Sequence, residues 1–231
     1  MTEEMYATTT ASKSACPSPD DYMKSFEGAD NIIVVTITGT LSGSYNSAEI
    51  AKKIYLEEHP DTKIHVIDSL SAGGEVDLLV RKLNHLVAEG LDFDQVLDAI
   101  TAYQSKTKLL FVLAKVDNLV KNGRLSKLVG TVVGLLNIRM VGEASKTGTL
   151  ELLQKARGQK KAIKAAFDEL IKAGYNGGHI TIAHRNNDKF IEQFSALIRE
   201  KFVQASIEVL PTSGLCSFYA EEGGLLMGYE I

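Results

Sequence analysis

A segment rich in hydroxyl groups and glycine, TITGTLSGSYNSA at positions 36–48, has the composition in this sequence that best suits ligand binding. Its glycines, Gly39 and Gly43, let the backbone come close to a bound group. A β-branched run precedes the segment and a helical pattern follows it, so free backbone N–H groups at the helix start favour an anion. Within the turn itself, Thr40, Ser42 and Ser44 supply three hydroxyl donors. The segment therefore predicts an anion-binding turn.

Three better-known site motifs do not fit this turn. A Walker P-loop requires Gly-Lys-Ser/Thr, and the segment has no lysine. A nucleophile elbow requires Gly-x-Ser-x-Gly, but Gly39 stands three residues before Ser42 and Gly43 follows it directly. The glycine spacing of a dinucleotide fingerprint is also absent. Two interpretations stay open: Ser42 and Ser44 bind a ligand, or they only cap the following helix.

Other polar positions suit structural roles better. Asp68 and Ser69 close a second strand, where a turn or capping role is expected, and His184 ends another strand as a structural histidine. Two short basic faces are predicted to be solvated; they consist of Lys121, Arg124 and Lys127, and of Arg157, Lys160, Lys161 and Lys164. No Asp, Glu or His cluster has metal-ligand spacing, so the sequence predicts no metal site and no catalytic residue.

The elements around the turn follow a βαβ pattern. Apolar runs at 31–38 and 63–68 predict parallel strands buried on both faces. Helices are expected at 19–26, from 44 to 59, at 75–88 and at 93–104, with Ser18 and Asp92 as N-caps. Ligands of such sheets bind at the carboxyl ends of the strands, which is where segment 36–48 begins.

The second half has a different pattern. Strands are expected at 109–114, 138–141, 150–153, 179–183, 207–210 and 225–229. Helices are expected within 118–136 and at 160–172 and 189–202. The sequence thus predicts an α/β protein with an N-terminal parallel-sheet βαβ domain (1–106) and a C-terminal α+β domain with a mostly antiparallel sheet (107–231).

Composition excludes several classes of protein. The chain has 231 residues and a formal net charge of -4, which argues against a nucleic-acid-binding protein. No apolar run approaches the ~20 residues of a membrane span, and residues 1–10 lack the apolar core of a signal peptide. Cys16 and Cys216 give no disulfide framework or metal spacing, so we expect a cytoplasmic protein.

Short segments across nearly the whole chain resemble the DegV family of fatty-acid-binding proteins. Residues 41–48 closely match the family's L-S-G-T-Y-x-S-A segment, and residues 14–18 loosely match T-S-x-P-S. Further matches, in family order, are 66–69 (V-I-D-S), 118–127 (L-x-K-G-G-R-I-x-K), 136–139 (L-N-I-K-P), 155–162 (K-x-R-G-x-K-K-A) and 182–184 (I-A-H).

The sequence departs from the family pattern in three places. The family's first two strands have no match, so the resemblance implies a chain that starts late, as a truncated product, a misassigned start or a fragment. The Thr-Ser pair of the family's Pro-Ser segment is Ser14-Ala15 here. Tyr219 stands where the family has histidine, which keeps a hydrogen-bond donor but puts proton transfer at that position in doubt.

The resemblance implies a binding protein without a cofactor. A long-chain fatty acid is expected between the two domains, with Ser14, Ser42, the Gly43 N–H and Tyr219 holding its carboxylate without any Arg or Lys. An apolar stretch at 125–136 is a candidate wall of the slot, although ordinary core packing explains it as well. Some family members present the acyl group to a separate fatty acid kinase, so the protein is expected to be a carrier and not an enzyme.

Two alternatives remain beside this interpretation. One is a domain of sugar or phosphoryl metabolism, because dihydroxyacetone kinases resemble the family in fold. The other is a remnant that binds nothing, if the unmatched front strands are needed for the pocket.

Overall fold

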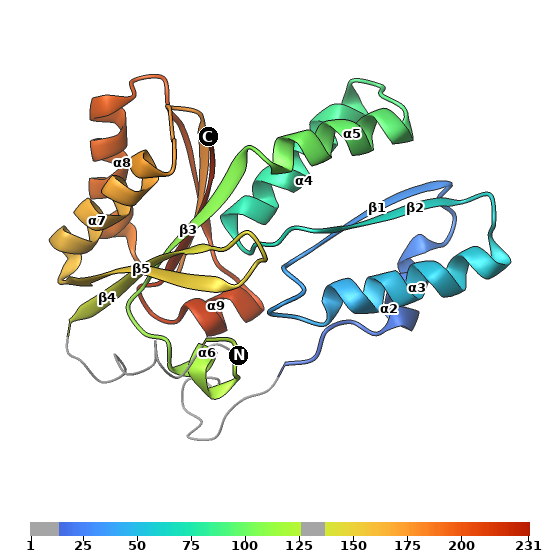
Figure 1. Ribbon diagram of the computed structural model, residues 1–231, viewed down its shortest axis with the longest axis horizontal. Coiled ribbons are helices and arrows are strands. Elements are labelled where there is room, and N and C mark those ends of the chain that lie inside the picture. The colour runs from blue at the N-terminus through green and yellow to red at the C-terminus, as the bar shows by residue number, and fades with distance from the viewer. Residues whose placement is uncertain (1–13, 126–136) are drawn as a thin grey trace.

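The computed structural model describes residues 14–125 and 137–231, and in them the chain forms two sheets lying side by side. The first sheet has two strands and the second has six, counted over these residues. Figure 1 shows the two-stranded sheet between helices α2 and α3 on one side and α4 and α5 on the other. The predicted α/β fold class, a parallel first sheet and a mostly antiparallel second sheet, is confirmed.

The first sheet pairs β1 (Asn31–Thr36) with β2 (Lys63–Asp68) in parallel. Alternate side chains of β1 face opposite layers: Ile33 and Val35 pack with α4 (Gly74–Ala88) and α5 (Phe93–Gln104). Ile32 and Val34 pack with α2 (Pro19–Phe26) and α3 (Ser44–Glu58). The prediction that this strand is buried on both faces is wrong for β1, where only Thr36 is buried. Within the described residues β1 has a partner strand on one edge only, which leaves its side chains half-exposed.

Two helices of this half begin at the predicted caps. Ser18 accepts a hydrogen bond from the Asp21 N–H, and the Asp21 carboxylate accepts one from the Ser18 N–H. Asp92 and Gln95 make the same reciprocal pair at the start of α5. Each pair satisfies two backbone donors that the first helical turn leaves free, which sets where the helix starts.

The second sheet has the strand order β5-β4-β3-β8-β6-β7. Its strands are β3 (Thr107–Leu113), β4 (Ile138–Ala144), β5 (Leu150–Arg157), β6 (His179–His184), β7 (Ser206–Pro211) and β8 (Leu225–Glu230). Only β6 and β7 pair in parallel. Helices α7 (Gln159–Lys172) and α8 (Asp188–Lys201) cover one face and bury the largest apolar cluster.

The opposite face carries two short helices, α6 (Asp117–Lys121) and α9 (Gly214–Ala220). The helical region predicted at 118–136, with interruptions at Gly123, Gly130 and Gly134, begins with α6, which ends at Lys121 just before Gly123. Residues 126–136 lie outside the described residues, so the rest of that region stays a prediction. Helix α9 was not predicted: it is short and starts at Gly214 without a side-chain cap, so it leaves no periodic signal.

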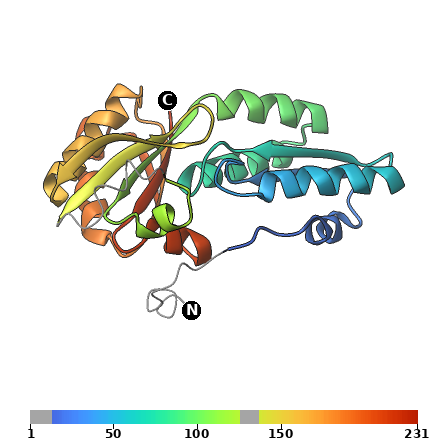
Figure 2. The same ribbon diagram turned by 60° about the horizontal axis from the view of Figure 1, so that its bottom comes forward.

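Helix α4 joins the two halves. Its first residue, Gly74, lies directly on the second sheet, where an added Cβ would come 2.2 Å from the Thr181 carbonyl oxygen. Gly228 of β8 contacts the backbone at the start of α4, since an added Cβ at Gly228 would lie 2.2 Å from the Glu75 nitrogen. Figure 1 shows α4 reaching from beside the two-stranded sheet to the second sheet, and Figure 2 shows the two halves of the molecule from another direction. The chain passes from α5 to β3 between residues 104 and 107, where the domain boundary at 106 stays a prediction.

Glu75 is a carboxyl group buried in this joint. Burial raises the pKa of Glu75, although the Thr107 hydroxyl donates a 2.8 Å hydrogen bond to it. At pH 7 we expect Glu75→Gln to increase the free energy of unfolding by about 1 kcal/mol, because the amide carries no charge to desolvate. The gain should vanish below the ordinary glutamate pKa of 4.5, where the carboxyl is neutral in both states. Urea unfolding at several pH values measures it, with the exposed Glu58→Gln as control.

Candidate functional site

The turn after β1 is held by hydrogen bonds from its own half. The Asp68 carboxylate accepts bonds from the Gly39 N–H at 3.1 Å and the Leu70 N–H at 2.9 Å, which is the turn role predicted for it. Helix α3 follows with Gly43 at its N-cap and without a side-chain cap. Ser42 and Ser44 therefore do not cap the helix in the usual way. Their hydroxyls bond each other at 2.9 Å, and the Ser44 N–H donates to Ser42 Oγ at 3.2 Å.

The segment before α2 lies across the start of α3. The Ser47 hydroxyl, buried on α3, donates a 2.7 Å hydrogen bond to the Pro17 carbonyl. Gly43 permits the close approach, since an added Cβ would sit 3.1 Å from Cys16 Sγ. This places Ser14 near α9, where its hydroxyl lies 3.3 Å from the Tyr219 hydroxyl.

Arg124 enters the site because α6 ends just before it. Gly123 takes a left-handed conformation (φ 70°), and the N–H groups of Gly123 and Arg124 bond the carbonyls of Val120 and Leu119. This is a Schellman ending, which turns the chain back across the last helical turn. The arginine therefore points toward the first half of the protein and not along a continuing helix.

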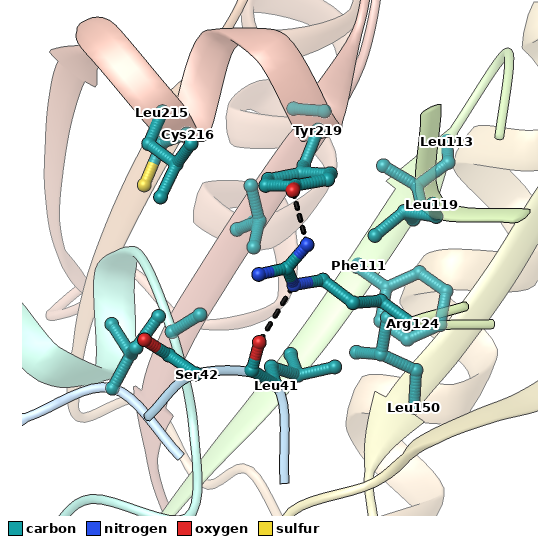
Figure 3. Close-up of a pocket in the computed structure, with 14 residues that line it drawn as sticks. Leu41, Ser42, Phe111, Leu113, Leu119, Arg124, Leu150, Leu215, Cys216 and Tyr219 are labelled. Atoms are coloured by element: carbon teal, nitrogen blue, oxygen red, sulfur yellow. Dashed lines mark hydrogen bonds between the residues drawn. The ribbon is translucent and has the colours of Figure 1, made fainter. Parts of the chain in front are cut away.

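The Arg124 guanidinium lies at the centre of the site (Figure 3). Its Nε donates a 2.6 Å hydrogen bond to the Leu41 carbonyl, and its Nη1 donates to the Tyr219 hydroxyl. The guanidinium carbon also lies 4.6 Å from the centre of the Tyr219 ring. One cation thus connects the turn after β1 with helix α9, which lie in opposite halves of the chain.

An apolar cavity and a polar cleft meet at this arginine. The cavity is lined chiefly by aliphatic side chains and Phe111 of β3, and Figure 3 shows them around the guanidinium. The cleft beside it is lined by Ser14, Gly43 and Ser44 among others. The residues that line both spaces are Ile37, Ser42, Arg124 and Leu215. A molecule with an apolar tail and an anionic head fits this arrangement, because the donors stand where the apolar space ends.

Sequence comparison assigns the chain to a family. The model of the DegV family, described as an uncharacterised protein family, matches residues 1–229. This chain belongs to the DegV family. A DegV domain-containing protein of Streptococcus pneumoniae strain R6 is 78% identical over all 231 residues, which cover 82% of that relative. One from Streptococcus gordonii is 77% identical with the same coverage.

Solved DegV structures share the fold closely. The Streptococcus pneumoniae Fatty Acid Kinase (Fak) B3 protein loaded with linoleic acid matches with TM-score 0.97 and 78% identity. The match covers 99% of this chain and 82% of that one. A DegV family protein from Eubacterium eligens loaded with heptadecanoic acid matches with TM-score 0.94 and 38% identity, over 99% and 83% of the two chains.

The four residues predicted for this DegV site, Ser14, Ser42, Gly43 and Tyr219, all lie along the cavity or the cleft. Their part in binding stays a prediction. Thr40 of the same turn makes a structural contact: its hydroxyl donates a 2.6 Å hydrogen bond to the Gly148 carbonyl of the β4–β5 hairpin.

The sequence predicted two solvated basic faces, and the structure agrees with only one of these predictions in full. The prediction that Arg124 is solvated is wrong, because its Nε bonds the Leu41 carbonyl. Arg124 lines both the cavity and the cleft, where the sequence led us to expect no arginine or lysine. The sequence spacing of Arg124 and Lys121 suggested that both lie on one exposed helical face. The signal that could have corrected this is Asn122-Gly123, a pair that commonly ends a helix. Lys127 and nearly all of the proposed wall 125–136 lie outside the described residues. The second basic face, Arg157 to Lys164, is exposed as predicted.

The described part of the chain shows neither a metal-binding cluster nor a membrane-spanning helix. It contains no group of three or more His, Cys, Asp or Glu side chains placed to hold a metal ion. It also contains no helix with the length and apolar character needed to cross a bilayer. His184 serves a structural contact there, since its Nδ1 accepts a 3.2 Å hydrogen bond from the Asn187 N–H.

Proposed function

We propose that this chain binds a long-chain fatty acid, with the acyl tail in the apolar cavity and the carboxylate in the polar cleft. The observation that carries the proposal is the junction at Arg124, where hydroxyl and guanidinium donors stand at the end of an apolar space. The fatty acids named for the pneumococcal and Eubacterium eligens relatives support it.

The energetics divide between the two ends of the ligand. Burial of one CH₂ group is worth about 0.8 kcal/mol, so a chain of ~16 carbons offers about 12 kcal/mol. Association costs roughly 4–15 kcal/mol in lost freedom. The tail must therefore be almost completely buried, and each charge-assisted hydrogen bond to the carboxylate adds ~1.5–3 kcal/mol. Ser14, Ser42, the Gly43 N–H, Tyr219 and Arg124 are the donors that we assign to the head group.

We further propose that the protein is an acyl carrier and not itself the catalyst. In this role it presents the carboxylate to a separate kinase that uses ATP, which places it in the cytoplasm, and it requires no cofactor. The kinase name of the pneumococcal relative supports the partner. A cleft of hydroxyls and one guanidinium suits such a role, because these donors bind a carboxylate and leave its oxygen available to a phosphoryl group.

Mass spectrometry of the purified protein tests the proposal. We expect native spectra to show one adduct, and organic extraction after denaturation to release about one C14–C18 fatty acid per chain. A sugar or a phosphate ester in the extract would favour the alternative relationship to dihydroxyacetone kinases. A ligand-free protein that also takes up no added oleate would contradict the carrier proposal and favour the non-binding remnant.

A further inference from the structure

A polar pocket at one end of the large sheet shares no lining residue with the acyl cavity or the cleft. It is built by the start of β4, the first residue of α7 and the loops before α8 and β8. Arg139, Gln159 and Gly223 line it, and each belongs to a sequence segment that the acyl site does not use. Helices α7 and α8, whose first turns border this pocket, pack against each other on one face of the sheet (Figure 1).

The pocket holds buried hydrogen-bond donors without acceptors. The Nε and Nη1 atoms of Arg139 are shielded from solvent and have no hydrogen-bond partner among the described residues. The amide nitrogen of Gln159 is in the same state. Buried donors are normally paired, so three unpaired N–H-bearing atoms on one pocket point to a missing acceptor. Burial also lowers the pKa of Arg139, as expected for a guanidinium without an anion beside it.

Hydrogen bonds hold the frame around these donors together. The loop before α8 is joined to the turn before β8 by backbone bonds in both directions, each 2.9 Å, between Arg185 and residues 223 and 224. Asn187, buried at the N-cap of α8, donates its side-chain amide to the Gly223 carbonyl at 2.6 Å. Its side chain therefore does not cap the helix, and neither α7 nor α8 has a side-chain cap. Both first turns keep free N–H groups beside the pocket.

The acidic residues of the pocket have other positions or partners. The Asp188 side chain is 91% exposed. The Glu222 carboxylate accepts a 3.2 Å hydrogen bond from Asn186 and lies 3.9 Å from Arg185. Arg139 and Lys189 are the cations on the lining. With these carboxylates exposed or paired, the unpaired donors and cations on the lining favour an acceptor with negative charge.

We propose that this pocket is a second ligand site, which binds a phosphate group between Arg139, Gln159 and the first turn of α8. A guanidinium donates charge-assisted hydrogen bonds to phosphate oxygens, and helix N-terminal N–H groups suit other oxygens of the same group. Donors supplied by several different elements on one lining suit an oxyanion with several acceptor oxygens. The inference is independent of the fatty acid.

Thermal unfolding in phosphate tests the site. At about 20 mM phosphate, for a millimolar Kd, we expect Tm to rise by about 4 °C above a chloride control of equal ionic strength. Arg139→Met should remove the rise, whereas Lys161→Met, an exposed neighbour on α7, should keep it. Arg124→Met should also keep it, which separates this pocket from the acyl site. Equal rises in wild type and Arg139→Met, or no rise in either, would overturn the proposal.

Two further measurements complete the test. If Arg139→Met does not fold, Gln159→Leu removes the other unpaired donor and should weaken phosphate binding at least threefold by calorimetry; unchanged binding would count against the site. Glycerol 3-phosphate and inorganic phosphate distinguish the source of the ligand. Tighter binding of the ester assigns an organic phosphate, equal or weaker binding assigns the free ion, and binding of neither contradicts the site.

Discussion

Arg124→Met should remove most of the fatty acid that copurifies with the protein. Arg124 is the cation at the junction of the apolar cavity and the polar cleft, and its loss removes a charge-assisted hydrogen bond to the carboxylate. Such a bond is worth ~1.5–3 kcal/mol, which corresponds to a roughly 10- to 150-fold higher Kd. Titration with a fluorescent fatty acid gives the Kd, and extraction with mass spectrometry gives the occupancy.

The control for this variant is Lys121→Met, which removes an exposed cation from the last residue of α6, three residues before Arg124. It should bind like wild type. Tyr219→Phe should have a smaller effect, about threefold to tenfold, because it removes one neutral hydroxyl that contacts Arg124 and Ser14. If Arg124→Met keeps full occupancy while circular dichroism shows a native fold, the head group is bound elsewhere.

Gly228→Ala should destabilise the fold strongly. The new Cβ would meet only backbone, at 2.2 Å from the Glu75 nitrogen and 2.4 Å from its Cα. Backbone cannot rotate away like a side chain, so α4 must lift from the sheet. We expect a loss of about 3 kcal/mol and a Tm lower by roughly 6–12 °C, measured by calorimetry. Val87→Ala on the same helix, 61% exposed in the parent, should change stability by less than about 0.5 kcal/mol.

The same variant should weaken fatty-acid binding at temperatures where it remains folded. Ala72 lines the acyl cavity and stands two residues before Gly74, so a shift of α4 changes the shape of the cavity. A stable Gly228→Ala protein with wild-type affinity would show that the contact between α4 and β8 does not determine the shape of the acyl cavity.

The local elements of this protein follow from local sequence. Apolar runs predict β1, β2 and β3 closely, and the capping residues Ser18 and Asp92 start their helices as predicted. These features depend on residues within one turn or one strand, so the signal is present in a short window of sequence. The prediction of an anion-binding turn rests on the same kind of local signal, since the glycines and hydroxyls of the turn are contiguous.

The arrangement of the candidate site was decided by tertiary structure. Arg124 and Tyr219 are 95 residues apart, and Ser14 and Tyr219 are 205 apart, so no spacing rule relates them. Arg124 enters the site because α6 stops at Lys121. The glycine interruption at Gly123 was predicted, but the direction in which Arg124 then points depends on tertiary contacts. The burial of β1 also depends on its neighbours rather than on its own apolar run. Sequence determined the chemistry of each segment, whereas contacts between distant segments determined which groups share one cavity, because only packing brings them within hydrogen-bond distance.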